Sequence, residues 1–341
     1  MKILLVGGTG TISAAVSRRL VEDGHHLYVV NRGNRNDLLP AAGVTRLLAD
    51  ARDEQAVAQL VAPLEFDAVA DFVAFTPAHL EQDYRLFKHK TRQFIFISSA
   101  SAYRKPPEGY RVTEDTPLGN PFSAYAREKI ACEEYLARLR GQEGFPVTIV
   151  RPSFTYAERT VPLGVRGERG SWQVIRRMIE GKPVIIHGDG TSLWTMTHAR
   201  DFARGFAGLT GNPAAIGEAV HVTSDETLTW NQVYEGIADA LGVPLRAVHV
   251  ASEFLAACSD NDLAASLIGD KANSVVFDNA KIKRLVPGFE ATIPFRVGIK
   301  ETIDNILARP ELQLPDEAFD RWCDRVIDTR QEAIARVRQG F

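Results

Sequence analysis

Cysteine is scarce in this chain of 341 residues. Only Cys132, Cys258 and Cys323 are present, and they lie far apart in the sequence. This spacing excludes a disulfide framework and a Cys-x-x-Cys metal site, and it is typical of a reducing compartment, so we expect a cytoplasmic protein. His187 and His198 have no carboxylate or cysteine partners at metal-ligand spacing, so we interpret them as structural and expect no metal.

The chain also lacks long apolar runs and an excess of charge of either sign. The N-terminal run Lys2–Val6 is short and leads directly into glycines, and no stretch approaches the roughly 20 apolar residues of a membrane span. The 40 basic and 43 acidic residues give a net charge of -3, which provides no general attraction to nucleic acid or to anionic lipid. We therefore expect neither a membrane nor a nucleic acid as partner.

The composition is that of a globular protein, with 45% hydrophobic and 24% charged residues, and the length exceeds what one core usually serves. The first part of the chain alternates short apolar runs with amphipathic segments, which is the pattern of βαβ units. The predicted strands are Lys2–Val6, His26–Val30, Val44–Leu48, Ala68–Phe72, Gln93–Ser98 and Val147–Arg151.

These strands predict an α/β fold, a Rossmann-type doubly wound parallel sheet with a smaller mixed C-terminal substrate lobe. We expect residues 1–156 to form the dinucleotide-binding domain, with returns near 195–225. Residues 157–194 and 226–341 are then expected to form the substrate-binding lobe, because glycines interrupt the chain from about residue 164 and helices dominate toward the end.

A glycine-rich turn follows the first predicted strand and precedes a predicted helix, which is the context of a dinucleotide-binding loop. It contains Gly7, Thr9, Gly10, Thr11 and Ile12. Glycines let the backbone approach a pyrophosphate, and the N–H groups at the helix start provide positive potential for it. The third glycine of the usual pattern is Ser13 here, a residue small enough for close helix–strand packing.

The end of the second predicted strand indicates which nucleotide is bound. NAD enzymes usually carry an acidic residue there, whereas this chain has Asn31, Arg32 and Arg35, and a guanidinium can bind a 2′-phosphate. NADP is therefore favoured as the cofactor, with NAD as the alternative. After the third strand, Asp50 and Ala51 stand where a carboxylate could accept from the adenine amino group, although a loop aspartate without a ligand fits equally well.

Tyr125 and Lys129 are four residues apart at the start of a helical segment, so both project from one face. A neighbouring ammonium stabilises phenolate and lowers the pKa of a tyrosine, which can then exchange a proton with an alcohol or carbonyl. Upstream, a buried-looking strand ends in Ser98-Ser99, whose hydroxyl could hold the substrate oxygen.

The chain resembles the extended short-chain dehydrogenase/reductases, the NAD-dependent epimerase/dehydratase group, over nearly its whole length. The matching motifs are Gly7-Gly8-Thr9-Gly10, Asp50-Ala51, Ile97-Ser98-Ser99, Tyr125-x-x-x-Lys129, Arg151-Pro152-Ser153, His187-Gly188-Asp189-Gly190-Thr191 and Phe277-Asp278-Asn279.

The resemblance implies roles for particular residues. Ser99, Tyr125 and Lys129 form the catalytic set, Lys129 also contacts the nicotinamide ribose, and Ala74 and Pro152 lie beside the cofactor. Phe75, Ser153 and Thr155 are expected beside the substrate. The resemblance also implies a homodimer through the Tyr125 helix and its predecessor near residues 80–87, although a monomer would violate nothing in the sequence.

Several departures from the family pattern bear on the substrate. Where the family's dehydratases carry an Asp-Glu pair, this chain has Ala100-Ser101, which disfavours a dehydratase and likewise a decarboxylase. Trp194 stands where many nucleotide-sugar enzymes have an arginine, so it either stacks on the substrate or is a core aromatic. Arg166 and Arg169 could instead clamp an anionic group, the alternative being that they are solvated.

These features lead to a functional hypothesis with one competitor. The first is an NAD(P)-dependent oxidoreductase or epimerase that acts on a hydroxyl or carbonyl carbon of a sugar-like or nucleotide-sugar substrate. The second is a non-catalytic nucleotide-sensing or RNA-binding protein of the same fold. The presence of Ser99, Tyr125 and Lys129 favours the enzyme.

Overall fold

The computed structural model describes residues 1–259 and 261–340, and the chain divides into two compact units. Unit 1 comprises Met1–Tyr156, Thr195–Asp225 and Val276–Ile293, and unit 2 comprises Ala157–Trp194, Glu226–Val275 and Pro294–Phe341. Residues 276–293 thus group with unit 1, whereas the sequence places them in the second lobe. The reason is local packing, because β15 (Val276–Phe277) pairs with β6 (Arg111–Val112) and α9 (Ala280–Leu285) packs against β12 (Ala219–Val222).

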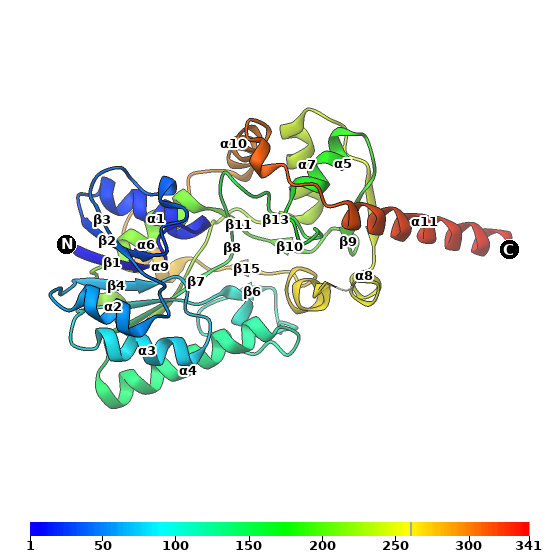
Figure 1. Cartoon of the computed structure of the whole chain (residues 1–341). Coiled ribbons are helices and arrows are strands. Elements are labelled where there is room, and N and C mark those ends of the chain that lie inside the picture. Colours follow the sequence, from blue (N-terminus) through cyan, green and yellow to red (C-terminus); the bar gives the residue numbers. More distant parts are fainter. Residues whose placement is uncertain (260, 341) are drawn as a thin grey trace. The chain divides into compact units, whose positions relative to one another are not determined.

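The core of unit 1 is a seven-stranded parallel sheet (Figure 1). The strand order is β12-β7-β5-β4-β1-β2-β3. The strands are β1 (Lys2–Val6), β2 (His26–Asn31), β3 (Val44–Leu48), β4 (Ala68–Asp71), β5 (Phe94–Ile97), β7 (Val147–Pro152) and β12 (Ala219–Val222). The predicted doubly wound α/β fold is confirmed. The sequence missed the seventh strand, β12, a four-residue run that contains His221 and reaches the sheet only by pairing with β7.

Helices cover both faces of this sheet. In Figure 1, α1 (Thr11–Glu22) and α6 (Ala199–Leu209) lie together on one side, and α2 (Glu54–Val61), α3 (Pro77–Phe87) and α4 (Ala124–Glu143) lie on the other. The second face buries an apolar core in which Phe87 and Phe94 are fully inaccessible to solvent. Burial of such rings is the main favourable contribution to folding, at roughly 25 cal/mol per Å² of apolar surface.

Helix α4 has clear start and stop signals. The Ser123 side chain accepts a hydrogen bond from the Ala126 N–H and so satisfies one of the unpaired donors of the first turn. The helix ends at Gly144, whose φ of 66° lies in the left-handed region that favours glycine. These signals fix where the helix begins, and therefore which residues face the sheet.

Smaller elements complete unit 1. Short helical turns occur at Asn36–Leu38, Ala100–Ala102 and Pro213–Ala215, and β8 (Phe154–Tyr156) pairs in parallel with β11 (Met196–His198). His198 also begins α6, since its Nδ1 accepts from the Arg200 N–H at 3.2 Å.

Unit 2 combines helices with two small two-stranded sheets. β9 (Val184–His187) pairs in parallel with β14 (Ala247–Val250), and β10 (Leu193–Trp194) pairs antiparallel with β13 (Leu228–Thr229). The helices are α5 (Trp172–Ile179), α7 (Trp230–Leu241), α8 (Ser252–Ala257), α10 (Phe295–Leu307), α11 (Glu317–Gln339), a π-helix at Ala264–Lys271 and a short turn at Pro310–Leu312. Its core contains Trp230 and Tyr234, both fully buried.

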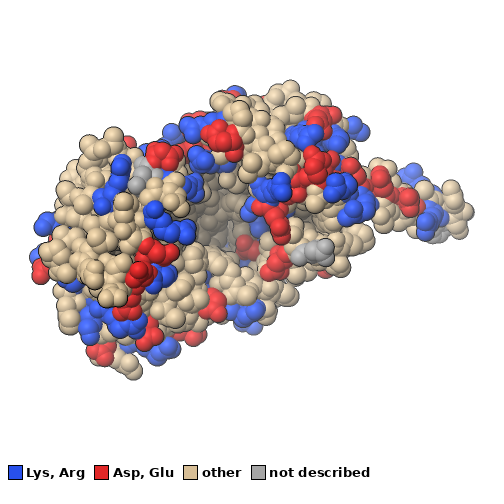
Figure 2. All heavy atoms as spheres, in the orientation of Figure 1, with Lys and Arg blue, Asp and Glu red and all other residues tan. Residues whose placement is uncertain are grey.

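The surface agrees with the balanced composition. Figure 2 shows lysine and arginine side chains intermixed with aspartate and glutamate over the face it draws. Among the described residues, no helix is both long enough and apolar enough to cross a membrane.

Candidate active site

The turn between β1 and α1 requires glycine at its first position. Gly7 has a φ of +83°, and a Cβ there would lie 2.5 Å from Cγ1 of Val73. The Ser13 hydroxyl accepts from the Gly10 N–H at 2.8 Å and is buried, so the serine that replaces the third glycine closes the first helical turn. The start of α1, at Thr11 and Ile12, provides the positive end of a helix dipole beside this turn.

A cavity of about 400 Å³ lies next to this turn in unit 1. Its lining includes seven of the residues predicted to bind the cofactor, namely Gly7, Thr9, Asn31, Arg32, Arg35, Asp50 and Ala51. Phe75, predicted to face the substrate, lines the same cavity. Gly10, Thr11, Ile12, Ala74, Lys129 and Pro152 are not part of its lining.

Six residues of the lining were not among the predicted site residues: Val30, Gly33, Asn34, Arg52, Val73 and His79. The position of Arg52 directly after Asp50-Ala51 was a usable signal. His79 lines the cavity because it lies in the first turn of α3, where its Nδ1 accepts from the Phe75 N–H at 3.1 Å. That contact depends on tertiary placement and leaves no pattern in the sequence.

The three arginines of the cavity differ in what they contact. Arg52 Nη2 lies 2.6 Å from Asp71 Oδ2, and Arg52 Nη1 lies 3.3 Å from Asp83 Oδ1. Asp71 also accepts from the N–H groups of Val73 and Ala74. Burial raises the pKa of the Asp83 carboxyl well above its ordinary value, with the nearby Asp71 adding to the shift. Arg52 is therefore held by buried carboxyl groups.

The other two arginines are available to a ligand. The side chains of Arg32 and Arg35 are exposed, and neither pairs with any part of the chain that the structure describes. Both line the cavity at the end of β2. A phosphate group placed there would meet two guanidinium groups that are paired with none of the carboxylates the structure describes.

Lys129 is buried on α4, close to the carboxyl ends of the sheet strands. Its Nζ donates to the carbonyl oxygens of Ala74 and Ile97, each at 2.7 Å. The same Nζ lies 4.8 Å from the centre of the Phe75 ring and 5.7 Å from that of Tyr125. Burial is the main cause that lowers the pKa of Lys129 to about 8. The ammonium is thus held beside the tyrosine by main-chain oxygens.

Tyr125 occupies the first turn of α4, one helical turn before Lys129. Its side chain is 46% exposed, and its ring centre lies 6.4 Å from that of Phe75. The arrangement gives a solvent-accessible phenol beside a buried ammonium. Such a phenol can donate a proton to a substrate oxygen, because the adjacent positive charge stabilises the phenolate that remains.

Ser99 follows β5 and begins the helical turn at Ala100–Ala102. Its hydroxyl oxygen lies 2.8 Å from the Ser101 hydroxyl and accepts from the Ser101 N–H at 3.2 Å. Ser101 therefore orients Ser99, a role the sequence did not predict. Ser153 Oγ donates to the Thr195 carbonyl oxygen at 3.2 Å, and the Thr155 hydroxyl donates to the carbonyl oxygen of Ser153 at 3.4 Å.

The remaining predicted residues belong to unit 2. Arg166 is exposed and lines a second cavity of about 400 Å³ together with Arg169 and Arg325. Trp194 is 4% exposed and packs 6.2 Å from the ring centre of Trp230. His187 is buried against Trp230, and burial lowers its pKa to about 4.

Comparison with known proteins identifies the family. The model of the NAD dependent epimerase/dehydratase family matches residues 3–222. The chain belongs to this family. The resemblance found in the sequence is thereby confirmed, and the glycine turn, Ser99, Tyr125 and Lys129 all lie within the matched range.

Relatives in the family carry out different reactions. The chain is 30% identical to 2′-dehydrokanamycin reductase of Streptomyces kanamyceticus, over 85% of this chain and 80% of that protein. It is 25% identical to dTDP-glucose 4,6-dehydratase of an Actinoplanes species, over 89% and 97%. Among solved structures, UDP-glucuronic acid 4-epimerase from Bacillus cereus, in complex with UDP-glucuronic acid and NAD, matches with a TM-score of 0.72 and 20% identity, covering 90% and 99%. The two relatives are thus named as a reductase and a dehydratase, and the likeness to the epimerase structure shows that the fold is shared.

Proposed function

We propose that this chain is an NADPH-dependent reductase for the ketone of a sugar-like substrate. The observation that carries the proposal is the pair on α4, an accessible Tyr125 phenol beside the buried Lys129 ammonium. The name of the relative from Streptomyces kanamyceticus supports the direction of the reaction and the sugar-like substrate class.

The cavity at the glycine turn fits a dinucleotide. Gly7 admits no Cβ, the start of α1 offers N–H groups to a pyrophosphate, and Arg32 and Arg35 offer guanidinium groups to a 2′-phosphate. Asp50 remains the candidate for the adenine amino group. The absence of an acidic residue at the end of β2 supports NADP over NAD.

In the proposed reaction, the bound dinucleotide supplies the hydride that reduces the carbonyl carbon. Tyr125 donates its phenolic proton to the carbonyl oxygen, so that an alcohol forms and a phenolate remains. The Lys129 ammonium stabilises this phenolate, which takes up a proton from solvent before the next turnover. Ser99 holds the substrate oxygen with its hydroxyl, whose orientation is set by Ser101.

An epimerase is the second candidate, because the same residues can remove and then return hydrogen at one carbon. The structural likeness to an epimerase supports the fold needed for it. A dehydratase is disfavoured by Ala100 and Ser101, since neither side chain can act as the acid and base that eliminate water. Ser101 instead contacts Ser99.

The first experiment identifies any nucleotide released when the purified protein is denatured, and then titrates the cofactor-free chain with NADPH and NADH. An empty site that prefers NADPH supports the reductase, whereas tightly held stoichiometric NAD⁺ supports the epimerase. Tyr125→Phe is the matched variant: we expect unchanged NADPH affinity and loss of turnover on a panel of sugar ketones. Unchanged turnover in Tyr125→Phe would contradict the mechanism.

A further inference from the structure

A buried polar network lies at the carboxyl ends of three neighbouring strands in unit 1. In the sheet register, Arg151 on β7 is paired with His221 on β12, and the N–H of Ser98, at the end of β5, donates to the Val150 carbonyl oxygen. Ser98, Arg151 and His221 therefore stand side by side across the three strands. All three side chains are buried, and two of them directly precede predicted site residues, Ser98 before Ser99 and Arg151 before Pro152.

Glu133 on α4 joins this row of residues. Its Oε1 accepts from Ser98 Oγ at 2.5 Å and from Arg151 Nε at 3.0 Å, and its Oε2 accepts from Arg151 Nη2 at 2.6 Å. The two charged side chains are each 6% exposed. Glu133 follows Lys129 by one helical turn and Tyr125 by two, so the three occupy one face of α4. The helix that carries the phenol is thus held to β7 by a bidentate buried ion pair, and to the end of β5 by the hydrogen bond from Ser98.

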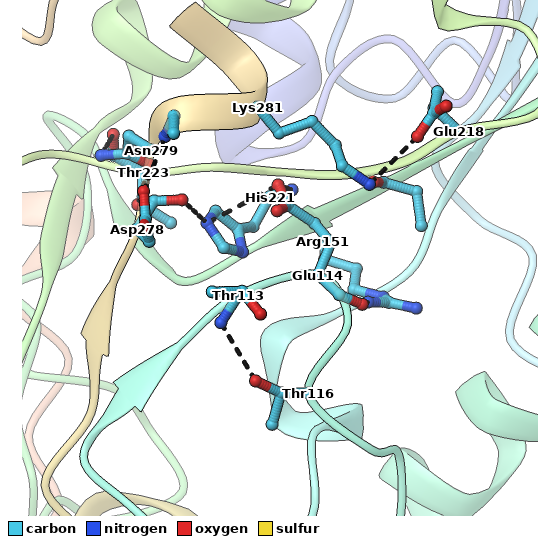
Figure 3. Close-up of polar contacts among 12 residues, drawn as sticks. Thr113, Glu114, Thr116, Arg151, Glu218, His221, Thr223, Asp278, Asn279 and Lys281 are labelled. Atoms are coloured by element: carbon cyan, nitrogen blue, oxygen red, sulfur yellow. Dashed lines mark hydrogen bonds and ion pairs between the residues drawn. The ribbon is translucent and has the colours of Figure 1, made fainter.

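The hydrogen bonds of the network define the protonation of His221. Its Nε2 lies 2.8 Å from the carbonyl oxygen of Asp278, which can only accept, so Nε2 carries the proton. Nδ1 then accepts from the Tyr103 hydroxyl at 3.1 Å, and that hydroxyl accepts from Arg151 Nη1 at 3.2 Å. Figure 3 shows His221 between Asp278 and Glu114, and Glu114 Oε1 accepts from the main-chain N–H of His221 at 3.1 Å.

Glu133 and Arg151 form the bidentate ion pair of this network, and a second carboxylate, that of Glu114, lies 3.6 Å from His221 Nε2. Burial lowers the pKa of His221 and raises the pKa of Tyr103, so both are neutral at physiological pH. The charges that act on Lys129 are those of Asp71, Glu133 and Arg52, with the thiol of Cys132 also nearby. The loss of one member of the pair would leave an unbalanced charge on the face of α4 that carries the phenol.

We propose that Glu133 and Arg151 are positioning residues for the reaction. They hold α4 in place against β5 and β7. In addition, the Glu133 anion and the Arg151 cation neutralise each other, so that the pair adds no net charge near Lys129 and Tyr125. The inference rests on the proposed function, because that function gives Tyr125 its role as proton donor. It goes beyond that function by assigning a part to two residues that need not touch substrate or cofactor.

The charge balance predicts opposite effects of two variants on Tyr125. Glu133→Gln leaves the Arg151 cation, which favours phenolate and lowers the pKa of Tyr125. Arg151→Gln leaves the Glu133 anion, which disfavours phenolate and raises the pKa of Tyr125. Eight residues of helix rise about 12 Å, and one unit charge at that distance from the half-exposed phenol, with an effective dielectric constant of about 40, gives a shift of about half a pH unit.

The test is a titration of tyrosinate absorbance in the near ultraviolet, with the trace of the matching Tyr125→Phe chain subtracted. It needs no substrate, so its outcome is separate from that of the proposed function. We expect a lower midpoint in Glu133→Gln, a higher midpoint in Arg151→Gln, and the parent midpoint in the double variant. Glu218→Gln is the control: Glu218 pairs with the partly exposed Lys281 at 3.0 Å (Figure 3), and we expect no shift. If the midpoints of the two single variants stay at the parent value or move in the same direction, the proposal that Glu133 and Arg151 neutralise each other near Tyr125 is overturned.

The double variant also tests positioning. Because it removes both charges of the pair together, it leaves neither Glu133 nor Arg151 as a buried charge without its partner, so it is the variant best able to fold. We expect kcat on the ketone panel to fall about tenfold in the double variant, with NADPH affinity within twofold of the parent. A double variant with full kcat would overturn the positioning role. If the parent itself shows no turnover on the ketone panel, that result counts against the proposed function. The tyrosinate titration then decides whether Glu133 and Arg151 act on Tyr125.

Discussion

Lys129 makes stability depend on pH in a direction that can be worked out from its surroundings. The lysine is 2% exposed, and burial lowers its pKa to about 8 from the ordinary value of 10.5. Below pH 8 the amine is protonated in both the folded and the unfolded chain, so the folded state bears the full cost of the buried charge. Between pH 8 and 10.5 the unfolded chain still holds the proton while the folded chain has lost it, so stability rises with pH.

The size of this effect follows from the gap between the two pKa values. At about 1.4 kcal/mol per pH unit, the free energy of unfolding gains about 3 kcal/mol as pH rises from 8 to 10.5. Lys129→Met removes the titration, but it leaves the carbonyl oxygens of Ala74 and Ile97 without the hydrogen bonds they now accept. The quantity to follow is therefore the difference in free energy of unfolding between the parent and the variant, and how that difference changes with pH.

The assay is urea unfolding of the two chains, followed by far-ultraviolet circular dichroism from pH 7 to 10.5. Both chains carry Tyr125→Phe, so the neighbouring phenol does not titrate. Burial raises the pKa of Cys132 to about 12, which keeps that thiol protonated over this range. We expect the parent to gain about 3 kcal/mol relative to Lys129→Met. A constant difference across this range would refute a depressed Lys129 pKa.

The remaining predictions concern the cavity at the glycine turn and α4. In the double variant Arg32→Ala with Arg35→Ala, we expect NADPH affinity to fall about tenfold or more and NADH affinity to stay within twofold, measured by fluorescence titration, because a charge-assisted bond contributes about 1.5–3 kcal/mol; an equal loss for both nucleotides would contradict the assignment. Arg52→Met should destabilise the chain by about 3 kcal/mol in urea unfolding, because it strips buried carboxyl groups of their cation, and an unchanged midpoint would contradict this. Ser123→Ala should cost about 1 kcal/mol through the lost cap of α4, while Thr76→Ala, at a helix start without a side-chain cap bond, should cost less; equal losses would show that the cap does not matter.

The sequence by itself determined the elements that rest on local patterns. Six strands of the parallel sheet follow from short apolar runs, and the glycine turn follows from residues whose backbone needs are visible in the sequence, as at Gly7. Tyr125 and Lys129 share a face because helical spacing places residues four apart together. The match to the family model covers residues 3–222, the range in which these motifs lie.

Tertiary structure decided what each polar side chain contacts. Arg32, Arg35 and Arg52 look alike in the sequence, yet only Arg52 is held by carboxyl groups, because Asp71 and Asp83 come from a neighbouring strand and helix. The strand β12 was missed because four residues around a histidine carry little periodicity, and pairing with β7 gives it its place.

The buried polar network of Ser98, Glu133, Arg151 and His221 shows the same limit of sequence reasoning most clearly. Ser98, Glu133, Arg151 and His221 lie 18 or more residues from their partners in the sequence. Sheet register and the packing of α4 bring them into contact, and burial makes their hydrogen bonds obligatory. Local propensity determined where the helix and strands form. Only the long-range pairing of those elements determined which charges neutralise each other and which remain for a ligand.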